Sequence, residues 1–287
     1  MSFVISTDTS ANLPTAELQW HQLYLLPFSY IVNEVEHQCL DLTAFDGDAY
    51  YEMLRHTPAS TSMISMDQYR QLWEPLLEEG HDILHVGMSS GISGAYQSAV
   101  MAARELREEY PQRRLVVFDT RAASLGEGIQ VLHAATCREA GYTLDETVRE
   151  LAELRPRIRQ IFTVDDLMHL RRGGRVSGVA AAVGTALRIK PLLKGDEAGR
   201  IVVFGKVQGR KRSVRALADN FAANAELLGR WPIGIAHAGC RAAMLKEYDP
   251  KARIILVDYE PVTGSHVGPG ALAMFYVAKE PWSSAIC

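Results

Sequence analysis

A glycine- and serine-rich turn at residues 87–94 has the composition of a ligand-binding loop; it reads GMSSGISG. It follows a short apolar run, 82–87, that predicts a buried strand, and it precedes a segment with apolar residues at helical spacing. Glycines let a backbone approach a ligand closely, and free N–H groups at a helix start can bind an anion. An ordinary capped loop has a similar composition, but ligands of doubly wound sheets bind at the carboxyl ends of strands. The position of the turn therefore favours a binding site.

The same turn also matches the nucleophile elbow of α/β-hydrolases, because residues 87–91 fit the pattern Gly-x-Ser-x-Gly around Ser89. Asp258 and His266 follow Ser89 in the chain order of a catalytic triad. However, further glycine and serine residues separate Ser89 from the predicted helix, and no His-Gly-Gly-Gly segment lies upstream. A serine hydrolase or esterase is therefore the alternative hypothesis, and a binding protein is the preferred one.

Two other polar loops contain residues suited to a ligand. Residues 61–65 read TSMIS, in which Ser65 has the spacing of a helix cap while Thr61 and Ser62 keep free hydroxyls. Residues 263–270 read TGSHVGPG, which predicts a tight loop between strands with His266 at its centre. Imidazole can hydrogen-bond to a carboxylate or pair with it, so His266 is a candidate ligand contact.

Two short basic clusters predict either a solvated face or a docking surface for an acidic or phosphate-bearing partner. The first is RRGGR at 171–175, with Arg171, Arg172 and Arg175; the second is GRKR at 209–212, which contains Arg210. Neither cluster has interleaved aromatic residues, and the net charge of the chain is −4. We therefore expect no nucleic-acid partner.

Motifs for cofactor binding, metal binding and membrane insertion are missing from the sequence, which excludes further classes of function. The sequence has no P-loop, no complete dinucleotide fingerprint and no His-Glu-x-x-His, and its cysteines form no Cys-x-x-Cys, so we expect no cofactor and no metal. No run approaches the roughly 20 apolar residues that would span a bilayer, and the first residues resemble a strand more than a signal peptide. We expect a cytoplasmic protein with at most transient membrane contact.

The elements that must position these loops alternate between strands and helices in the first half, which predicts a mainly parallel sheet with helices on both faces. Residues 23–32 read as one extended segment with an edge or bend at Pro27, and capping-box spacing at Ser65, Ser124 and Thr143 predicts three helix starts. The second half contains six candidate strands, and the polar loop 194–199 joins two of them in a hairpin, which predicts a mixed sheet with helices. Proline after Arg155 places the boundary between two α/β domains, 1–156 and 157–287.

Taken together, these turns resemble the DegV family of bacterial fatty-acid-binding proteins in order and spacing, over nearly the whole chain. The matching segments are 5–8, 61–65, 89–99, 119–126, 164–167, 173–178, 189–191 and 264–271. The resemblance implies two α/β domains that hold a long-chain fatty acid in an internal tunnel. It also implies a role without catalytic residues, similar to the binding subunit of bacterial fatty acid kinase. A separate kinase catalytic subunit would phosphorylate the bound carboxylate with ATP, and the acyl phosphate would enter phospholipid synthesis.

The resemblance assigns roles to individual residues. Thr61 and Ser93 would hydrogen-bond the carboxylate, with Ser62 and His266 beside them, and the arginines around 173–174 would face the kinase. One departure is that Met63 and Ile64 stand where the family often has Gln-Pro, which changes the stiffness of that turn. Burial of a 16-carbon chain offers on the order of 10 kcal/mol, at roughly 0.8 kcal/mol per CH₂, so the tail can supply most of the affinity. The hydroxyls then only need to orient the acid group.

Overall fold

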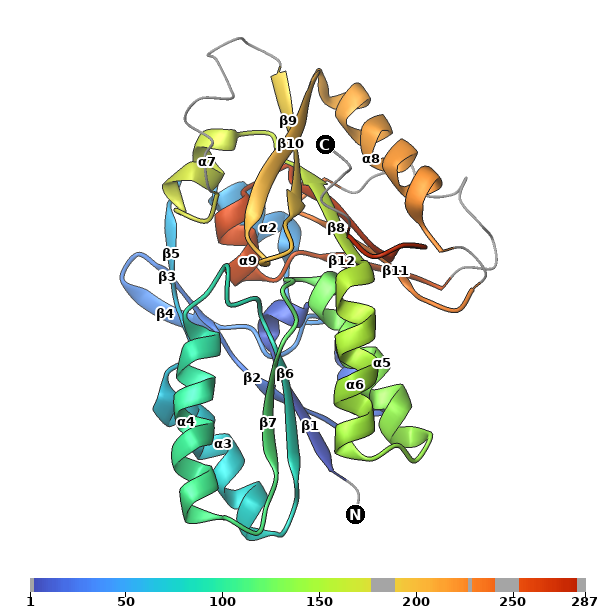
Figure 1. The fold of residues 1–287 in the computed structure, drawn as a ribbon. Helices are drawn as coiled ribbons and strands as arrows, with labels where there is room; N and C mark the ends of the chain where they lie inside the picture. Colours follow the sequence, from blue (N-terminus) through green and yellow to red (C-terminus); the bar gives the residue numbers. More distant parts are fainter. Residues whose placement is uncertain (1–2, 177–188, 227–228, 241–252, 283–287) are drawn as a thin grey trace.

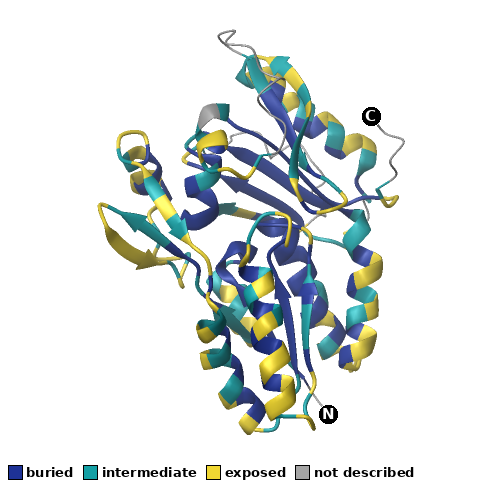
Figure 2. Ribbon diagram, turned by 60° about the vertical axis from the view of Figure 1, so that its left-hand side comes forward, coloured by how far each residue is buried: buried dark blue, intermediate teal, exposed yellow. Residues whose placement is uncertain are grey.

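The computed structural model describes residues 3–176, 189–226, 229–240 and 253–282. Two sheets are stacked end to end, and a smaller third sheet projects from one side (Figure 1). The strands of the two larger sheets are mostly buried, whereas much of the projecting sheet is exposed (Figure 2).

The first large sheet is parallel throughout, in the order β2-β1-β6-β7, as the sequence predicts. Its strands are β1 Val4–Asp8, β2 Leu23–Leu26, β6 Ile83–Gly87 and β7 Leu115–Asp119. One face is covered by α3 Met66–Glu78 and α4 Ala95–Glu109, and the other by α5 Leu125–Glu139 and α6 Leu144–Leu154. The predicted capping boxes at Ser65 and Thr143 are confirmed. The one at Ser124 is wrong, because Ser124 makes no side-chain cap and Glu127 instead accepts hydrogen bonds from Thr7 and Ser10.

The second large sheet is mixed, in the order β10-β9-β8-β13-β11-β12, which confirms the prediction for the second half. Its strands are β8 Ile158–Thr163, β9 Ile189–Gly195, β10 Ile201–Gln208, β11 Ile233–His237, β12 Ile254–Asp258 and β13 Leu272–Val277. The hairpin of β9 and β10 is antiparallel as predicted, and β11 and β12 are parallel. Helix α8 Arg210–Asn224 packs on one face of this sheet, and α5 packs on the other.

The third sheet is antiparallel, in the order β4-β3-β5, and is absent from the sequence-based prediction. Its strands are β3 Ser29–Val32, β4 Val35–Gln38 and β5 Ala59–Ser62. The prediction of a single extended segment at 23–32 is wrong: the chain bends around Pro27, so β2 joins the parallel sheet and β3 joins this one. Thr61 and Ser62 consequently lie in a strand and not in a turn. The remaining elements are η1 Thr9–Ala11, α1 Thr15–Trp20, α2 Gly47–Met53, η2 Arg155–Arg157, α7 Leu167–Arg172 and α9 Pro261–Val267.

Helix α5 belongs to the cores of both large sheets. Its Leu125 is fully buried in a cluster that also holds Leu84 of β6 and Phe275 of β13. A Cβ at Gly234 of β11 would lie 2.6 Å from the Cβ of Leu125, so the helix and the strand touch at a glycine. The two sheets are built from separate parts of the chain but share one apolar core. The division into domains 1–156 and 157–287 stays a prediction.

A buried asparagine joins three loops at the junction of the two sheets. Asn12 has a left-handed backbone, with φ 55°, and its Nδ2 donates to the carbonyl of Asp258 at 2.9 Å. Its Oδ1 accepts from the backbone N–H of Glu260 at 3.0 Å and from the hydroxyl of Ser124 at 3.2 Å. Each of these three partners is a buried or half-buried polar group. Removal of the Asn12 side chain would therefore leave three groups without this hydrogen bond.

We expect Asn12→Ala to lower the free energy of unfolding by about 3 kcal/mol more than Asn33→Ala, because buried polar groups lose their partners. Asn33 is a matched control: it also has a left-handed backbone, with φ 50°, but it is exposed in the turn between β3 and β4. Both variants therefore carry the same backbone penalty. Urea denaturation measures the difference, and equal losses in the two variants would contradict the role of Asn12.

Candidate functional site

The centre of the site is a hydrogen bond between Thr61 and His266, 205 positions apart in the sequence. Thr61 Oγ1 lies 2.9 Å from His266 Nε2. Thr61 comes from β5 and His266 from α9, and these two elements pack against each other. The prediction that His266 lies in a loop between strands is wrong, because Pro261–Val267 forms a short helix.

Glu260 starts the helix that carries His266. Its buried carboxylate accepts from the backbone N–H groups of Val262, at 2.7 Å, and Thr263, at 2.5 Å, and Pro261 follows in the first turn. Burial raises the pKa of Glu260 to about 7, although these hydrogen bonds act in the opposite direction. The cap fixes the direction of α9 from its first residue.

Two tyrosines of α2 hold the same helix from the side. The Tyr50 hydroxyl lies 3.0 Å from the carbonyl of Pro261, and the Tyr51 hydroxyl donates to the carbonyl of Tyr259 at 2.5 Å. A Cβ at Gly264 would lie 2.2 Å from the Tyr51 hydroxyl oxygen, so only glycine allows this close packing. Helix α9 is therefore positioned by tertiary contacts along its length.

The glycine pair after α7 makes room for the histidine ring. A Cβ at Gly173 would lie 2.7 Å from His266 Nδ1, whereas one at Gly174 would meet nothing within 4 Å. Nearby, His169 of α7 donates from Nε2 to the carbonyl of Ser265 at 2.6 Å. The Gly-Gly segment thus packs α7 against α9 and closes one side of the site.

A pocket of about 430 Å³ opens beside Thr61 and His266. Its lining has a cationic character and contains no carboxylate side chain; the basic and imidazole residues are Arg55, His56, His169, Arg172, Arg175 and His266. Such a pocket can hold an anionic group, with hydroxyls and imidazole to orient it and guanidinium groups to attract it. Sequence reasoning missed Arg55, His56 and His169, whose proximity depends on where α2, β5 and α7 pack.

Ser93 lies in the neighbouring turn, before α4, and does not belong to the lining of this pocket. Its hydroxyl accepts from the backbone N–H of Ala95 at 3.2 Å. A Cβ at Gly94 would lie 3.0 Å from the sulfur of Met63, so the Ser93 turn and the end of β5 are adjacent. Ser62 is exposed, and strand alternation directs it away from the face of Thr61. The structure joins Thr61 to His266 directly and packs the turn of Ser93 against the side chain of Met63, which follows Thr61 by two positions.

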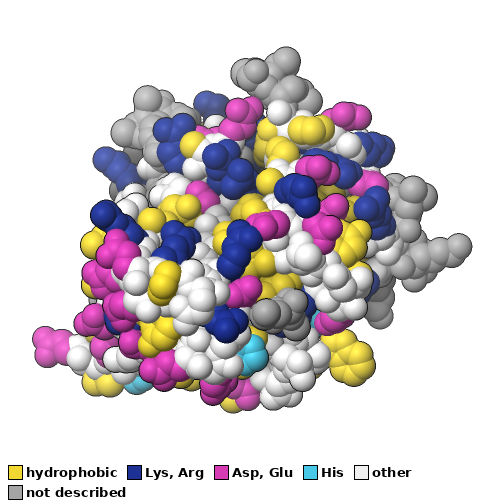
Figure 3. All heavy atoms as spheres, turned by 60° about the horizontal axis from the view of Figure 1, so that its bottom comes forward, with side chains coloured by type: hydrophobic (Ala, Val, Ile, Leu, Met, Phe, Trp, Pro, Cys, Tyr) yellow, Lys and Arg dark blue, Asp and Glu magenta, His cyan; other side chains and the backbone are white. Residues whose placement is uncertain are grey.

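Asp165 forms ion pairs with Arg210 of the second basic cluster and with Lys190. Its Oδ1 lies 3.6 Å from Arg210 Nη1 and 2.9 Å from Lys190 Nζ. Arg171, Arg172 and Arg175 are exposed beside the pocket mouth. On the face shown in Figure 3, by contrast, acidic and basic side chains are interspersed.

The three residues of the hydrolase hypothesis have separate partners. Ser89 is fully buried and donates to the carbonyl of Gly199 at 2.8 Å. His266 is bonded to Thr61, and Asp258 Oδ1 lies 3.0 Å from His237 Nδ1. No hydrogen bond in the described part of the chain links Ser89, Asp258 and His266 in a triad.

Metal-binding clusters and membrane-spanning helices are both absent from the described residues. No group of three or more His, Cys, Asp or Glu side chains in this part of the chain could hold a metal ion. None of the helices described has the length and apolar character needed to cross a membrane.

Fold and site together define an α/β protein with two large sheets, a small antiparallel sheet and a cationic pocket between β5, α7 and α9. A family model described as "Uncharacterised protein, DegV family" matches residues 2–279. A DegV domain-containing protein of Clostridium perfringens is 35% identical over an alignment of 289 positions that covers 97% of this chain and 99% of that protein. The chain belongs to the DegV family.

Solved structures of the family have the same fold. A DegV family protein from Thermus thermophilus, described by its fatty acid binding, aligns with a TM-score of 0.86 and 28% identity, over 96% of this chain and 100% of that one. A fatty-acid-binding DegV family protein from Streptococcus agalactiae aligns with a TM-score of 0.82 and 30% identity, over 98% and 100% of the two chains.

The histidine at the site is held neutral. Burial lowers the pKa of His266 to about 4, and the charges of Arg175 and His169 add to this effect. Between pH 6.5 and 4 the unfolded chain therefore binds a proton at this position that the folded protein does not. The stability that His266 contributes is complete above pH 6.5 and is lost as the pH falls towards 4. Glu260 has the opposite sign: its raised pKa makes stability fall as the pH rises from 4.5 through 7.

We expect the free energy of unfolding of the wild type, relative to His266→Gln, to fall by up to about 3 kcal/mol between pH 7 and pH 4. Subtracting the variant cancels the contribution of Glu260, which both proteins share. Denaturation curves at several pH values measure the difference. His56→Gln, at a side chain that is 76% exposed, controls for the loss of an imidazole at the surface. A constant difference between wild type and His266→Gln would show that His266 titrates normally.

Proposed function

We propose that this protein binds a long-chain fatty acid and holds its carboxyl group at the Thr61–His266 pair. The observation that carries the proposal is the 2.9 Å contact of these two side chains at the wall of a cationic pocket. Support comes from solved relatives of the same fold that are described as fatty-acid-binding proteins.

The acyl tail would enter the apolar core beside the head group, in an internal tunnel. Three segments carry the proposed head-group residues, and each also contributes a buried side chain to one apolar cluster: Ile64 after Thr61, Met88 before Ser93, and Val262 at the start of α9. A tail attached to the acid group thus meets apolar surface at once. Each buried CH₂ contributes roughly 0.8 kcal/mol, and methionine adapts its shape to irregular contacts.

The head group would be held mainly by neutral groups. Thr61 and Ser93 donate to the carboxylate, His266 orients the Thr61 hydroxyl, and Ser62 lies at the exposed edge. Burying a carboxylate without hydrogen bonds costs several kcal/mol, so these donors are needed. Since none of them is a full counter-charge, one carboxylate oxygen keeps its nucleophilic character.

This arrangement suits presentation of the acid to a separate ATP-dependent kinase, with acyl phosphate passing to phospholipid synthesis in the cytoplasm. The protein itself would need no cofactor and would catalyse no step. The exposed Arg171, Arg172 and Arg175 form a basic rim next to the pocket, and we add to it Arg210, which pairs with Asp165. We assign this rim to docking of the kinase catalytic subunit, because cationic rims steer acidic partners.

Native mass spectrometry of the purified protein should show an added mass equal to a long-chain fatty acid. Thr61→Val and Ser93→Ala should each weaken acid binding about 10- to 100-fold, since a hydrogen bond to a charged group is worth roughly 1.5–3 kcal/mol. Ser98→Ala, one turn into α4, is the matched control and should bind like the wild type. A ligand-free protein that a fluorophosphonate probe labels at Ser89 would instead favour the hydrolase.

Charge reversal at the rim should separate docking from binding. Arg171 is exposed and does not line the pocket, so Arg171→Glu should lower kcat/KM for phosphorylation about 10-fold at low salt and leave acid affinity unchanged. Arg104→Glu on α4, at a side chain that is 81% exposed, is the control for net charge. Equal effects of the two substitutions would remove the rim from the docking surface.

A further inference from the structure

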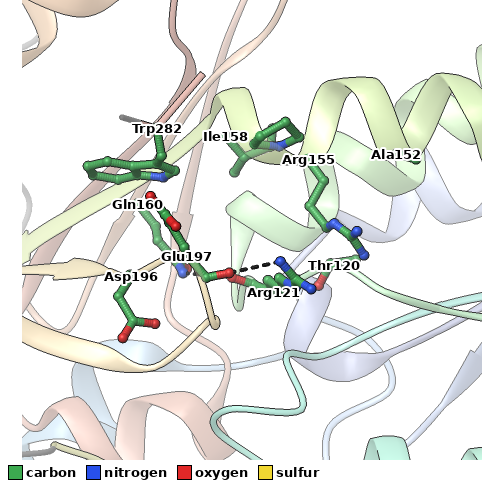
Figure 4. A pocket seen from close by; sticks show the side chains of 11 residues that line it. Thr120, Arg121, Ala152, Arg155, Ile158, Gln160, Asp196, Glu197 and Trp282 are labelled. Carbon is green, nitrogen blue, oxygen red and sulfur yellow. Dashed lines mark hydrogen bonds between the residues drawn. The ribbon is translucent and has the colours of Figure 1, made fainter. Parts of the chain in front are cut away.

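A second pocket, of about 240 Å³, lies where the parallel sheet meets the tip of the β9–β10 hairpin (Figure 4). Thr120 and Arg121 enter it directly after β7, Arg155 and Pro156 from the end of α6, and 195–197 from the hairpin. It is therefore at the carboxyl end of a parallel strand, where α/β proteins commonly bind ligands. It shares no lining residue with the pocket at Thr61 and His266.

Two guanidinium groups face this pocket without a carboxylate partner. Arg121 Nη1 donates to the backbone carbonyl of Glu197 at 3.0 Å, and Arg155 Nη1 donates to that of Asp119 at 2.9 Å. Neither forms an ion pair with a described residue. Burial lowers the pKa of Arg155 and the charge of Arg121 lowers it further, while the charge of Asp119 acts in the opposite direction. Two like charges that face one cavity repel each other unless an anion lies between them.

The carboxylates of the lining leave this positive charge largely uncompensated. Asp196 is already occupied, because it accepts from Ala198 N and from Arg200 N and Nε within its own turn. Glu197 is exposed, so water screens its charge. An anion that enters the pocket thus meets two guanidinium groups, while Asp196 is paired within its own turn and Asp119 accepts from Ser90 and from the backbone N–H of Arg121.

The opposite wall is apolar and has further positive charge behind it. In Figure 4, Trp282 lies across the pocket from the two arginines, and Ile158 lies above. The Arg159 guanidinium and the Lys194 ammonium stack on the Trp282 ring, at 4.0 and 4.5 Å from its centroid. The pocket therefore combines a charged end with an apolar end.

We propose that this pocket binds a small phosphate monoester, with the phosphate between Arg121 and Arg155 and the organic group against Trp282 and Ile158. A guanidinium group can donate two parallel hydrogen bonds to the oxygens of a phosphate. Two arginines that line the same pocket can therefore hold a phosphate between them. Thr120 and Gln160 complete the lining with polar groups. The ligand would contact both sheets at once.

Calorimetric titration with inorganic phosphate and with phenyl phosphate, at pH 7.5 and low salt, tests the proposal. We expect phenyl phosphate to bind at least 5-fold more tightly than phosphate. Arg121→Gln and Arg155→Gln should weaken both about 10-fold or more, and Glu197→Gln should tighten both because it removes the remaining negative charge. Arg121 is exposed, so its replacement tests the site without disturbing the core.

Arg104→Gln on α4 is the control for general charge and should leave both affinities unchanged. Absence of binding by the wild type, or equal affinities in all variants, would overturn the proposal. Loss of binding in Arg175→Gln but not in Arg121→Gln would also overturn it, because the anion would then occupy the pocket at His266. None of these results depends on whether the protein binds a fatty acid.

Discussion

The structure depends on satisfying buried polar groups at the junction of its two large sheets, and Asn12 is the residue that does so. Its side chain holds the N–H of Glu260, and Glu260 caps the helix that carries His266. His266 in turn bonds Thr61 on the projecting sheet. A chain of hydrogen bonds therefore runs from the first βα turn to the pocket. The geometry of the pocket follows from contacts formed some distance behind it.

A pair of buried acids strengthens the same junction. Burial raises the pKa of Asp8, and burial with the neighbouring Asp8 charge raises that of Glu127 well above its usual value. Hydroxyls of Thr7 and Ser10 donate to Glu127, while backbone N–H groups of Ser10 and Met88 donate to Asp8. These bonds tie α5 to the ends of β1 and β6. Since α5 also packs on the mixed sheet, the same helix connects the cores of both large sheets.

Local patterns in the sequence predicted the parts of the fold that local forces determine. Alternating strands and helices gave the parallel sheet, and the capping boxes at Ser65 and Thr143 marked two helix starts. The third sheet was not predicted, because β4 is exposed at every position and its sequence has no apolar alternation. Helix α9 was not predicted, because it has only seven residues and one of them is Gly264. It is held in place by the cap of Glu260 and by the tyrosines of α2. Thr61, Ser93 and His266 are predictions from the family resemblance, whereas the arginine and histidine lining could be found only in the tertiary structure.

The placement of Thr61 on the projecting sheet has a mechanical consequence. Thr61 belongs to the small, partly exposed sheet of β3, β4 and β5. His266 belongs to α9, which lies beside the core built around α5. Moving this sheet outward would break the pair and the contacts of β3 and β5 with α9, whereas parting the two large sheets would expose their common core. Opening at the small sheet therefore costs less buried apolar surface than opening between the large ones.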